Sequence, residues 1–245
     1  MTNASFLADK FASGLPYERY LHSGTDEQQR RWTQVYDATH LSEAQTKLVA
    51  GFVRAMKILI FSGIWCGDCV QQCPLIYRIA EANTAKIDLR FVERPKESEL
   101  LPELRINAGS LVPVVMFLSE DNEWCATAGD RTISRYRALA RAKLGPLCPT
   151  GIVAPDKDEN DATLCDWLNE IEGVQLMLRL TPRLRQYCTA ILSAISTATD
   201  PDSQKNTRSR SPGNSAARRR ASVNACSWTS PPNITCGMAA SWRSS

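Results

Sequence analysis

Cys66 and Cys69 stand between a short apolar run and a segment with helical character. Two cysteines separated by two residues in the first turn of a helix bring their sulfurs close enough to form a disulfide. The first cysteine meets free backbone N–H groups and the positive end of the helix dipole, which stabilise a thiolate. Because the thiolate is the nucleophile, the pattern predicts thiol–disulfide exchange. Cys66 is predicted to attack, and Cys69, one turn deeper, to resolve the mixed disulfide.

The residues around this pair suggest further roles. Trp65 is expected to shield the sulfurs and to offer a flat apolar contact to a substrate polypeptide. Asp68 lies between the cysteines, where its charge opposes thiolate formation by about as much as the helix terminus favours it, about 0.3–1 kcal/mol. Two interpretations of Asp68 stay open: it accepts the proton of Cys69 through water, or it binds free N–H groups at the helix start. Glu93 is a weaker candidate base.

Cys73 follows Cys69 by four residues and therefore shares a helical face with it. We interpret it as a small buried residue; an alternative disulfide or protection against over-oxidation is the less common use. The order Cys66, Cys69, Cys73, Pro74 also matches part of an iron–sulfur run, which makes a metal or cluster site one alternative function. The expected first ligand falls on Gly63, so no metal site is predicted. A binding module with idle cysteines is the other alternative.

The surrounding pattern predicts alternating strands and helices. Four strands are expected, at Ile58–Phe61, Ile87–Val92, Val114–Leu118 and Trp124–Ala128, the last two joined by a turn at 119–123. Helices are expected over Val70–Ala82, interrupted by Pro74, over Glu97–Leu104, and over Ser134–Leu144, closed by Gly145-Pro146. This order predicts an α/β fold with one parallel strand pair and an antiparallel edge.

Helical extensions are predicted on both sides of this domain. Residues 1–50 are expected to be a helical N-terminal extension, with a capping box at Ser42 and Gln45 followed by apolar residues at helical spacing as far as Met56. Residues 51–150 form the α/β domain, 151–195 a polar linker (including Asp158 and Glu159) with an amphipathic C-terminal helix, and 196–245 a basic, serine-rich tail. The tail has too few aliphatic residues to offset its ordering entropy, so we expect it to be disordered.

Composition restricts the remaining function classes. The 245 residues carry a net charge of only +3, with 43% hydrophobic and 22% charged residues, so no nucleic-acid partner is expected. The chain begins without the features of a secretory signal, and its longest apolar run is too short to span a bilayer. We therefore expect a cytoplasmic protein without membrane contact, whose nine cysteines are mostly reduced.

Four features in the same order resemble thioredoxin: the apolar strand, the Trp65-Cys66-Gly67-Asp68-Cys69 motif, Pro74 five residues later, and Val112-Pro113 before a strand. The resemblance covers about 57–145, and the flanking phrases, which include Gly129-Asp130-Arg131, look like bacterial thioredoxin-like proteins with a helical N-terminal extension. It implies a three-layer α/β/α sandwich with a mixed central sheet and a redox-active disulfide as the sole cofactor.

The resemblance also implies a substrate site. Val112-Pro113 would be a cis peptide facing the cysteines, and Trp65, Gly67, Val112 and Pro113 would contact a disulfide-bearing protein or small molecule. A reductase would supply the electrons. The sequence departs from the family at one point, because the buried acid that assists the resolving thiol falls on Ile60, which cannot transfer a proton.

Overall fold

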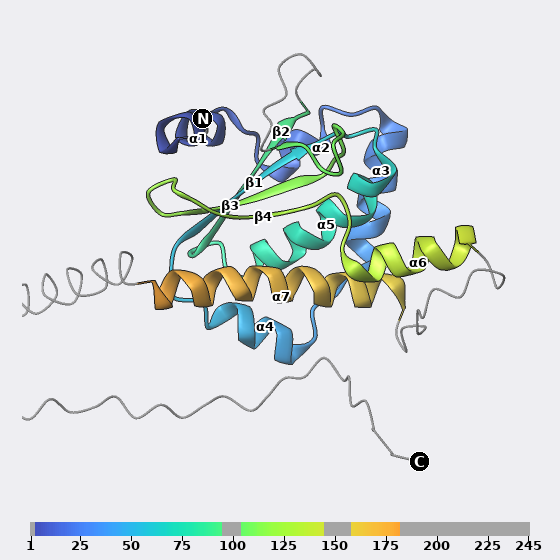
Figure 1. The fold of residues 1–245 in the computed structure, drawn as a ribbon. Helices are drawn as coiled ribbons and strands as arrows, with labels where there is room; N and C mark the ends of the chain where they lie inside the picture. The colour runs from blue at the N-terminus through green and yellow to red at the C-terminus, as the bar shows by residue number, and fades with distance from the viewer. Residues whose placement is uncertain (1–2, 95–103, 145–157, 182–245) are drawn as a thin grey trace, which may run out of the picture. The chain divides into compact units, whose positions relative to one another are not determined.

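A mixed four-stranded sheet forms the middle layer of the protein (Figure 1). Its strands are β1 (Met56–Ser62), β2 (Ile87–Glu93), β3 (Val114–Ser119) and β4 (Trp124–Ala128), in the order β2-β1-β3-β4. β1 pairs in parallel with β2, whereas the β1–β3 and β3–β4 pairs are antiparallel. All four strands lie where the sequence predicts them, within two residues at each end. The computed structural model describes residues 3–94, 104–144 and 158–181, which belong to one unit, Met1–Leu184.

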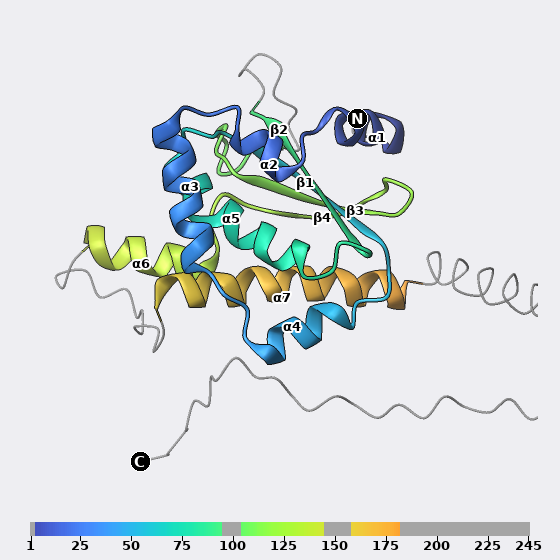
Figure 2. The same cartoon turned by 180° about the vertical axis from the view of Figure 1, so that it is seen from behind.

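Alternate residues of β1 enter two separate hydrophobic clusters, one on each face of the sheet. Ile58 and Ile60 pack with residues of α2 (Tyr17–Leu21), α3 (Asp26–Ala38), α5 (Gly67–Glu81) and α7 (Glu159–Leu180). Leu59 and Phe61 pack on the opposite face with Leu7 and Phe11 of α1 (Ala4–Ser13). Figures 1 and 2 show α5 and α7 on one side of the sheet and α1 towards the other. Helices therefore cover both faces, and the α/β/α prediction is confirmed.

The N-terminal helices form part of the same core as α5. Aromatic rings from these helices, α5 and β2 pack together, and the centre of each ring lies about 6 Å or less from the centre of at least two others. The rings are those of Tyr17, Tyr20, Trp32, Tyr36, Tyr77 and Phe91. The aromatic residues of the extension thus serve core packing. The predicted boundaries between extensions and domain remain predictions, but the hydrophobic core continues across residue 50.

One predicted helix is shorter than expected. The capping box at Ser42 and Gln45 is present, but α4 (Glu43–Ala50) ends with Gly51 at its C-cap. Met56 is instead the first residue of β1, where it pairs with Ile87. A glycine terminates a helix easily, and an apolar run alone does not distinguish a helix from a buried strand. The prediction of helical spacing as far as Met56 was therefore wrong.

Three further helices differ in detail from their predictions. α5 is a single helix that contains Pro74 rather than one interrupted by it. Asp158 caps α7 through its side chain and Glu159 belongs to that helix, so both are helical residues rather than linker. α6 (Ile133–Leu144) begins one residue before its predicted start.

Three predicted segments lie outside the described residues: the helix at 97–104 (apart from Leu104), the Gly145-Pro146 stop and the tail at 196–245. Within the described ranges, no helix has the length and apolarity needed to cross a membrane.

Candidate active site

Cys66 caps the N-terminus of α5, directly after the loop that follows β1. Its backbone is extended, with φ −77° and ψ 128°, and its amide N–H donates to the Gly63 carbonyl at 2.9 Å. The Cys66 side chain is partly exposed, whereas Cys69, one turn along the helix, is fully buried. Both are free thiols. The structure thus places an accessible sulfur at a helix start with a covered sulfur beneath it.

The cis peptide bond Val112-Pro113 faces this sulfur. The Cys66 Sγ lies 3.7 Å from the Val112 carbonyl oxygen, and the thiol donates to it. Val112 and Pro113 are themselves buried, just before β3, while the preceding Leu111 is exposed. The position that the family resemblance implies for this peptide is therefore confirmed.

Cys69 lies in a hydrogen-bonded pocket under Cys66. The Gly63 N–H donates to Cys69 Sγ at 3.5 Å, and the thiols of Cys66 and Cys73 both lie close enough to act on its pKa. Burial raises the pKa of Cys69, and the neighbouring Cys66 thiol partly opposes this rise. The neighbouring Cys69 thiol, followed by burial, raises the pKa of Cys66, against the backbone N–H groups of Cys69 and Asp68. The two sulfurs therefore titrate as a pair that holds its last proton tightly.

Trp65 and Gly67 border the exposed side of Cys66. The Trp65 side chain is 53% exposed, and the Arg94 guanidinium lies 5.9 Å from the centre of its ring. A Cβ atom on Gly63 would come within 2.8 Å of the Trp65 ring, so glycine at position 63 makes room for the indole. A Cβ on Gly67 would meet no atom within 4 Å, which leaves open space beside the Cys66 sulfur.

The Asp68 carboxylate forms ion pairs with two arginines. Its Oδ2 accepts a hydrogen bond from Arg131 Nη2 at 2.6 Å, and its Oδ1 lies 3.5 Å from Arg135 Nε in an ion pair without a hydrogen bond. These two partners follow Asp68 by more than sixty positions and are not evident from its local sequence. Their positive charges offset its repulsion of a thiolate, so that opposition is weaker than the sequence alone suggested.

A buried carboxylate holds Arg131 in place. Asp130 is 1% exposed and bonds Arg131 Nη1 at 2.6 Å, and it also accepts a hydrogen bond from the Tyr136 hydroxyl at 2.6 Å. Gln72 of α5 donates to the Asp130 carbonyl at 2.6 Å and accepts from the Thr132 N–H. This network links the active-site helix to the start of α6. The Gly129-Asp130-Arg131 motif contributes to the family resemblance in the sequence, but its contacts with α5 could not be predicted from it.

Ile60 is fully buried among apolar residues, so no acid stands at the position where the family has one. Hydroxyl side chains lie beside the buried sulfurs instead. Ser62 Oγ lies 3.7 Å from Cys73 Sγ, and the Tyr20 hydroxyl neighbours Ser62 and donates to Glu93 Oε2. Sequence reasoning missed Ser62 and Tyr20; a serine at the end of an apolar strand was the available signal. Cys73 is fully buried, as expected.

No group of three or more histidine, cysteine or acidic side chains suited to a metal ion occurs in the part of the chain that the structure describes. The interpretation of Cys66, Cys69 and Cys73 as cluster ligands therefore gains no support from the geometry.

Replacing Asp68 with asparagine is expected to make the pair more oxidising. The change removes a negative charge beside Cys66 and leaves Arg131 and Arg135 in place, so the Cys66 thiolate becomes more stable. A lower Cys66 pKa stabilises the reduced form at neutral pH, and the reduction potential should rise by about 30 mV, which corresponds to about tenfold in the equilibrium with glutathione. Redox titration against glutathione measures this shift.

The matched control is Glu27→Gln, which removes the acidic partner of Arg30 in the first turn of α3, far from the sulfurs in the sequence. It should leave the potential unchanged. An unchanged or lower potential in Asp68→Asn would show that the carboxylate does not act on the pair.

Comparison with known proteins identifies the family. A family model described as Thioredoxin matches residues 14–141, a little over half of the chain. No curated protein matches the sequence. A crystal structure of a protein of unknown function from Pseudomonas aeruginosa is similar over 68% of this chain and 96% of its own, with 20% identity and a TM-score of 0.54. An HIV epitope-scaffold is similar over 68% of this chain and 95% of its own, with 16% identity and a TM-score of 0.49. The structural likeness concerns the fold alone, and the family match establishes that this chain belongs to the thioredoxin family.

Proposed function

We propose that the protein is a thiol–disulfide oxidoreductase in which Cys66 is the nucleophile and Cys69 the resolving thiol. The observation that carries this proposal is the pairing of a partly exposed Cys66 sulfur at the start of α5 with a fully buried Cys69 thiol in the first turn of the same helix. Thiol–disulfide exchange needs one sulfur that a substrate can reach and a second that is kept from solvent until the mixed disulfide forms.

The reaction consists of two exchanges. The Cys66 thiolate attacks one sulfur of a substrate disulfide, so that a Cys66–substrate disulfide forms and the other substrate sulfur leaves as a thiolate. Cys69 then loses its proton and attacks Cys66, which forms the Cys66–Cys69 disulfide and releases the second substrate sulfur. The substrate gains two electrons and the protein loses two. A dithiol-bearing reductase must return them, so reduction of substrates is the favoured direction.

The substrate is a disulfide within a polypeptide or a small molecule. The Val112 carbonyl, 3.7 Å from Cys66 Sγ, stands where an extended segment could pair with it as an added strand. Trp65 and Leu111, the residues that precede Cys66 and Val112 in the sequence, expose apolar surface. We assign substrate contacts to Trp65, Gly67, Val112 and Pro113.

The test is to trap the first intermediate with the full-length chain. Reduced Cys69→Ser is expected to accumulate a mixed disulfide with insulin through Cys66, because the resolving sulfur is missing. Reduced Cys66→Ser is expected to accumulate none at position 69, since that sulfur is fully buried. Non-reducing electrophoresis and peptide mass spectrometry locate the linkage. Equal trapping by the double variant Cys66→Ser/Cys69→Ser would contradict the assignment.

The rival function is a binding module that keeps the fold and leaves the cysteines idle. Buried Ile60 at the acid position is the observation in its favour. Such a module would bind reduced and oxidised peptides equally and trap neither, so the same experiment separates the two functions.

A further inference from the structure

We propose that Cys73, Ser62, Tyr20 and Glu93 form a proton relay that carries the proton of Cys69 to the protein surface during resolution. The proposal rests on the proposed function, because it concerns the second exchange of that reaction. It assigns a role to four side chains outside the Cys66–Cys69 motif.

A relay is needed because Cys69 is sealed from water. Its side chain is 0% exposed, and a thiol attacks a disulfide only after its proton has left. Ile60 cannot accept that proton. The nearest carboxylate in sequence, Asp68, already binds the guanidinium groups of Arg131 and Arg135. A proton acceptor for Cys69 must therefore be reached on its buried side.

The inner half of the relay runs from α5 to β1. The Cys73 thiol lies one turn further along α5 than the Cys69 thiol and acts on it directly. Cys73 Sγ in turn lies 3.7 Å from Ser62 Oγ at the end of β1. All three side chains are 0% exposed. Each carries both a donor hydrogen and an acceptor lone pair, as a proton-conducting chain requires.

The outer half runs from β1 through α2 to β2. The Tyr20 hydroxyl neighbours Ser62 closely enough for that side chain to act on its pKa, and it donates to Glu93 Oε2 at 3.3 Å. Tyr20 is 2% exposed, whereas Glu93 is an exposed residue at the last position of β2. The chain of contacts therefore starts at the buried sulfur and ends at a carboxylate in contact with solvent.

The proton transfer balances along this chain. The Cys69 proton passes to Cys73, whose own proton passes to Ser62, and so on through Tyr20 to the Glu93 carboxylate. Every intermediate group ends with as many protons as it had. The net result is a Cys69 thiolate, which attacks Cys66, and a protonated Glu93, which returns its proton to water or to the substrate thiolate that leaves.

The other titratable groups around Cys73 offer no competing route. Tyr17 of α2 also faces Cys73, but its hydroxyl makes no hydrogen bond with the described residues. Tyr17 stacks on Tyr77 at 3.9 Å and is influenced by Glu18 through space alone. Of the residues that approach Cys73, Ser62 leads on through the neighbouring Tyr20 hydroxyl to a carboxylate.

The experiment separates the two exchanges in time. The full-length reduced protein is mixed in a stopped-flow spectrophotometer with a symmetrical aromatic disulfide whose two thiols absorb visible light only after they are released. The first rise in absorbance depends on probe concentration and reports attack by Cys66. The second is independent of probe concentration and reports resolution by Cys69. Cys66→Ser gives the background from other cysteines, and Cys69→Ser should show the first phase without the second.

Glu93→Gln and Tyr20→Phe are each expected to slow the second phase by about tenfold or more and to leave the first unchanged. The double variant should be no slower than either single variant, because the relay acts as a unit. Cys73→Ala should slow resolution, whereas Cys73→Ser, which keeps a donor and an acceptor, should restore it. A purely structural role for these groups predicts neither the selective loss nor the rescue.

The pH profile gives an independent signature. Burial raises the pKa of Cys69, so without the relay the thiolate fraction near neutral pH is small and grows about tenfold per pH unit. The second phase of Glu93→Gln should therefore rise steeply with pH, and that of the unmodified protein should rise less.

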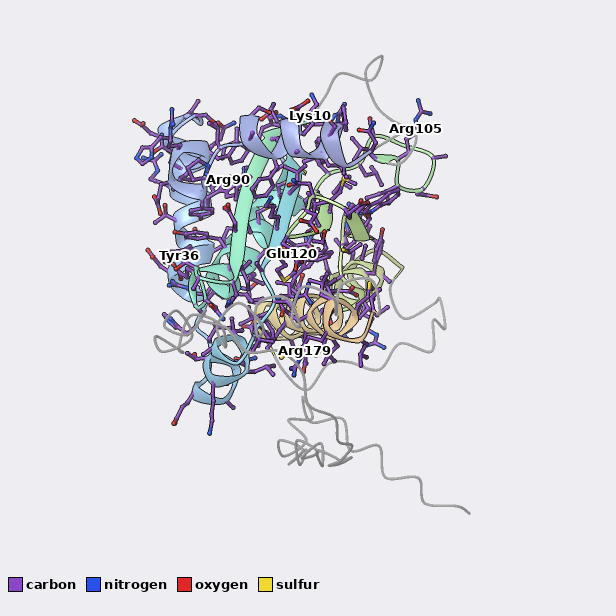
Figure 3. All side chains as sticks on the ribbon, turned by 90° about the vertical axis from the view of Figure 1, so that its left-hand side faces the viewer. Lys10, Tyr36, Arg90, Arg105, Glu120 and Arg179 are labelled. Atoms are coloured by element: carbon purple, nitrogen blue, oxygen red, sulfur yellow. The ribbon has the colours of Figure 1, made fainter. Side chains whose placement is uncertain are left out.

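Tyr36→Phe is the matched control. Tyr36, labelled in Figure 3, donates from α3 to Glu81 at 2.8 Å, which is the same kind of tyrosine–carboxylate bond outside the relay. It should leave both phases unchanged. Wild-type second phases in both Glu93→Gln and Tyr20→Phe, with unaltered pH profiles, would overturn the relay. Absence of any second phase that needs Cys69 would instead overturn the proposed function.

Discussion

Replacing Cys66 with serine is expected to reduce the rate of insulin reduction to that of dithiothreitol alone. The Cys66 sulfur is the partly exposed member of the pair and contacts the Val112 carbonyl, whereas Cys69 is fully buried. A serine hydroxyl at this point neither ionises near neutral pH nor forms a stable bond to sulfur, so this side chain can no longer make the first attack. Insulin precipitation in the presence of dithiothreitol, followed by turbidity, measures the effect.

Cys125→Ser is the control for this experiment. Cys125 is also partly exposed, and its thiol donates to the Glu123 carbonyl at 3.4 Å, a contact that a serine hydroxyl can replace. This variant should retain the full rate. Insulin reduction by Cys66→Ser at the rate of the unmodified protein would mean that the catalytic sulfur lies elsewhere in the chain.

The core of the site was predictable because it depends on local spacing. Cys66, Cys69 and Cys73 follow one another on a single helix, so their relative positions are fixed by the geometry of one helical turn. The buried strand before them was equally clear from four consecutive apolar residues, Ile58–Phe61, that fill both faces of the sheet. Val112-Pro113 was located through the family resemblance rather than through spacing.

The contacts that tune the site were not predictable, since they join residues far apart in the sequence. Arg131 reaches Asp68 across 63 positions, and Tyr20 reaches Glu93 across 73. These contacts form only when the start of α6 reaches the first turn of α5 and when α2 packs on β2. A single sequence carries no signal for such pairings, so Glu93 was rated a weaker candidate without its partner.

The N-terminal helices contribute directly to the position of the active-site loop. The Trp32 indole N–H of α3 donates to the Ile64 carbonyl at 3.0 Å, two residues before Cys66. The Trp32 ring is 0% exposed and contacts the rings of Tyr17, Tyr20 and Phe91. The same side chain therefore stabilises the core and the loop that presents the reactive sulfur.

Trp32→Ala is accordingly expected to lower the free energy of unfolding by about 3–5 kcal/mol, the usual cost of removing a large aromatic side chain from a core. Such a loss is a large part of the 5–15 kcal/mol by which domains of about this size are stable. Urea denaturation followed by circular dichroism measures it. Where the variant remains folded, the rate of attack by Cys66 should also fall, because the Ile64 carbonyl loses its donor.

Two further tryptophan variants separate the packing contribution from the hydrogen bond. Trp32→Phe keeps an aromatic ring in the core and loses the N–H donor, so part of the cost, about 1–3 kcal/mol, should remain. Trp124→Ala removes a side chain that is 44% exposed on β4 and should change the stability by about 0.5 kcal/mol or less. Equal losses in Trp32→Ala and Trp124→Ala would show that α3 does not share the core of the domain. A graded series, from Trp124→Ala through Trp32→Phe to Trp32→Ala, is the result that the Trp32–Ile64 contact requires.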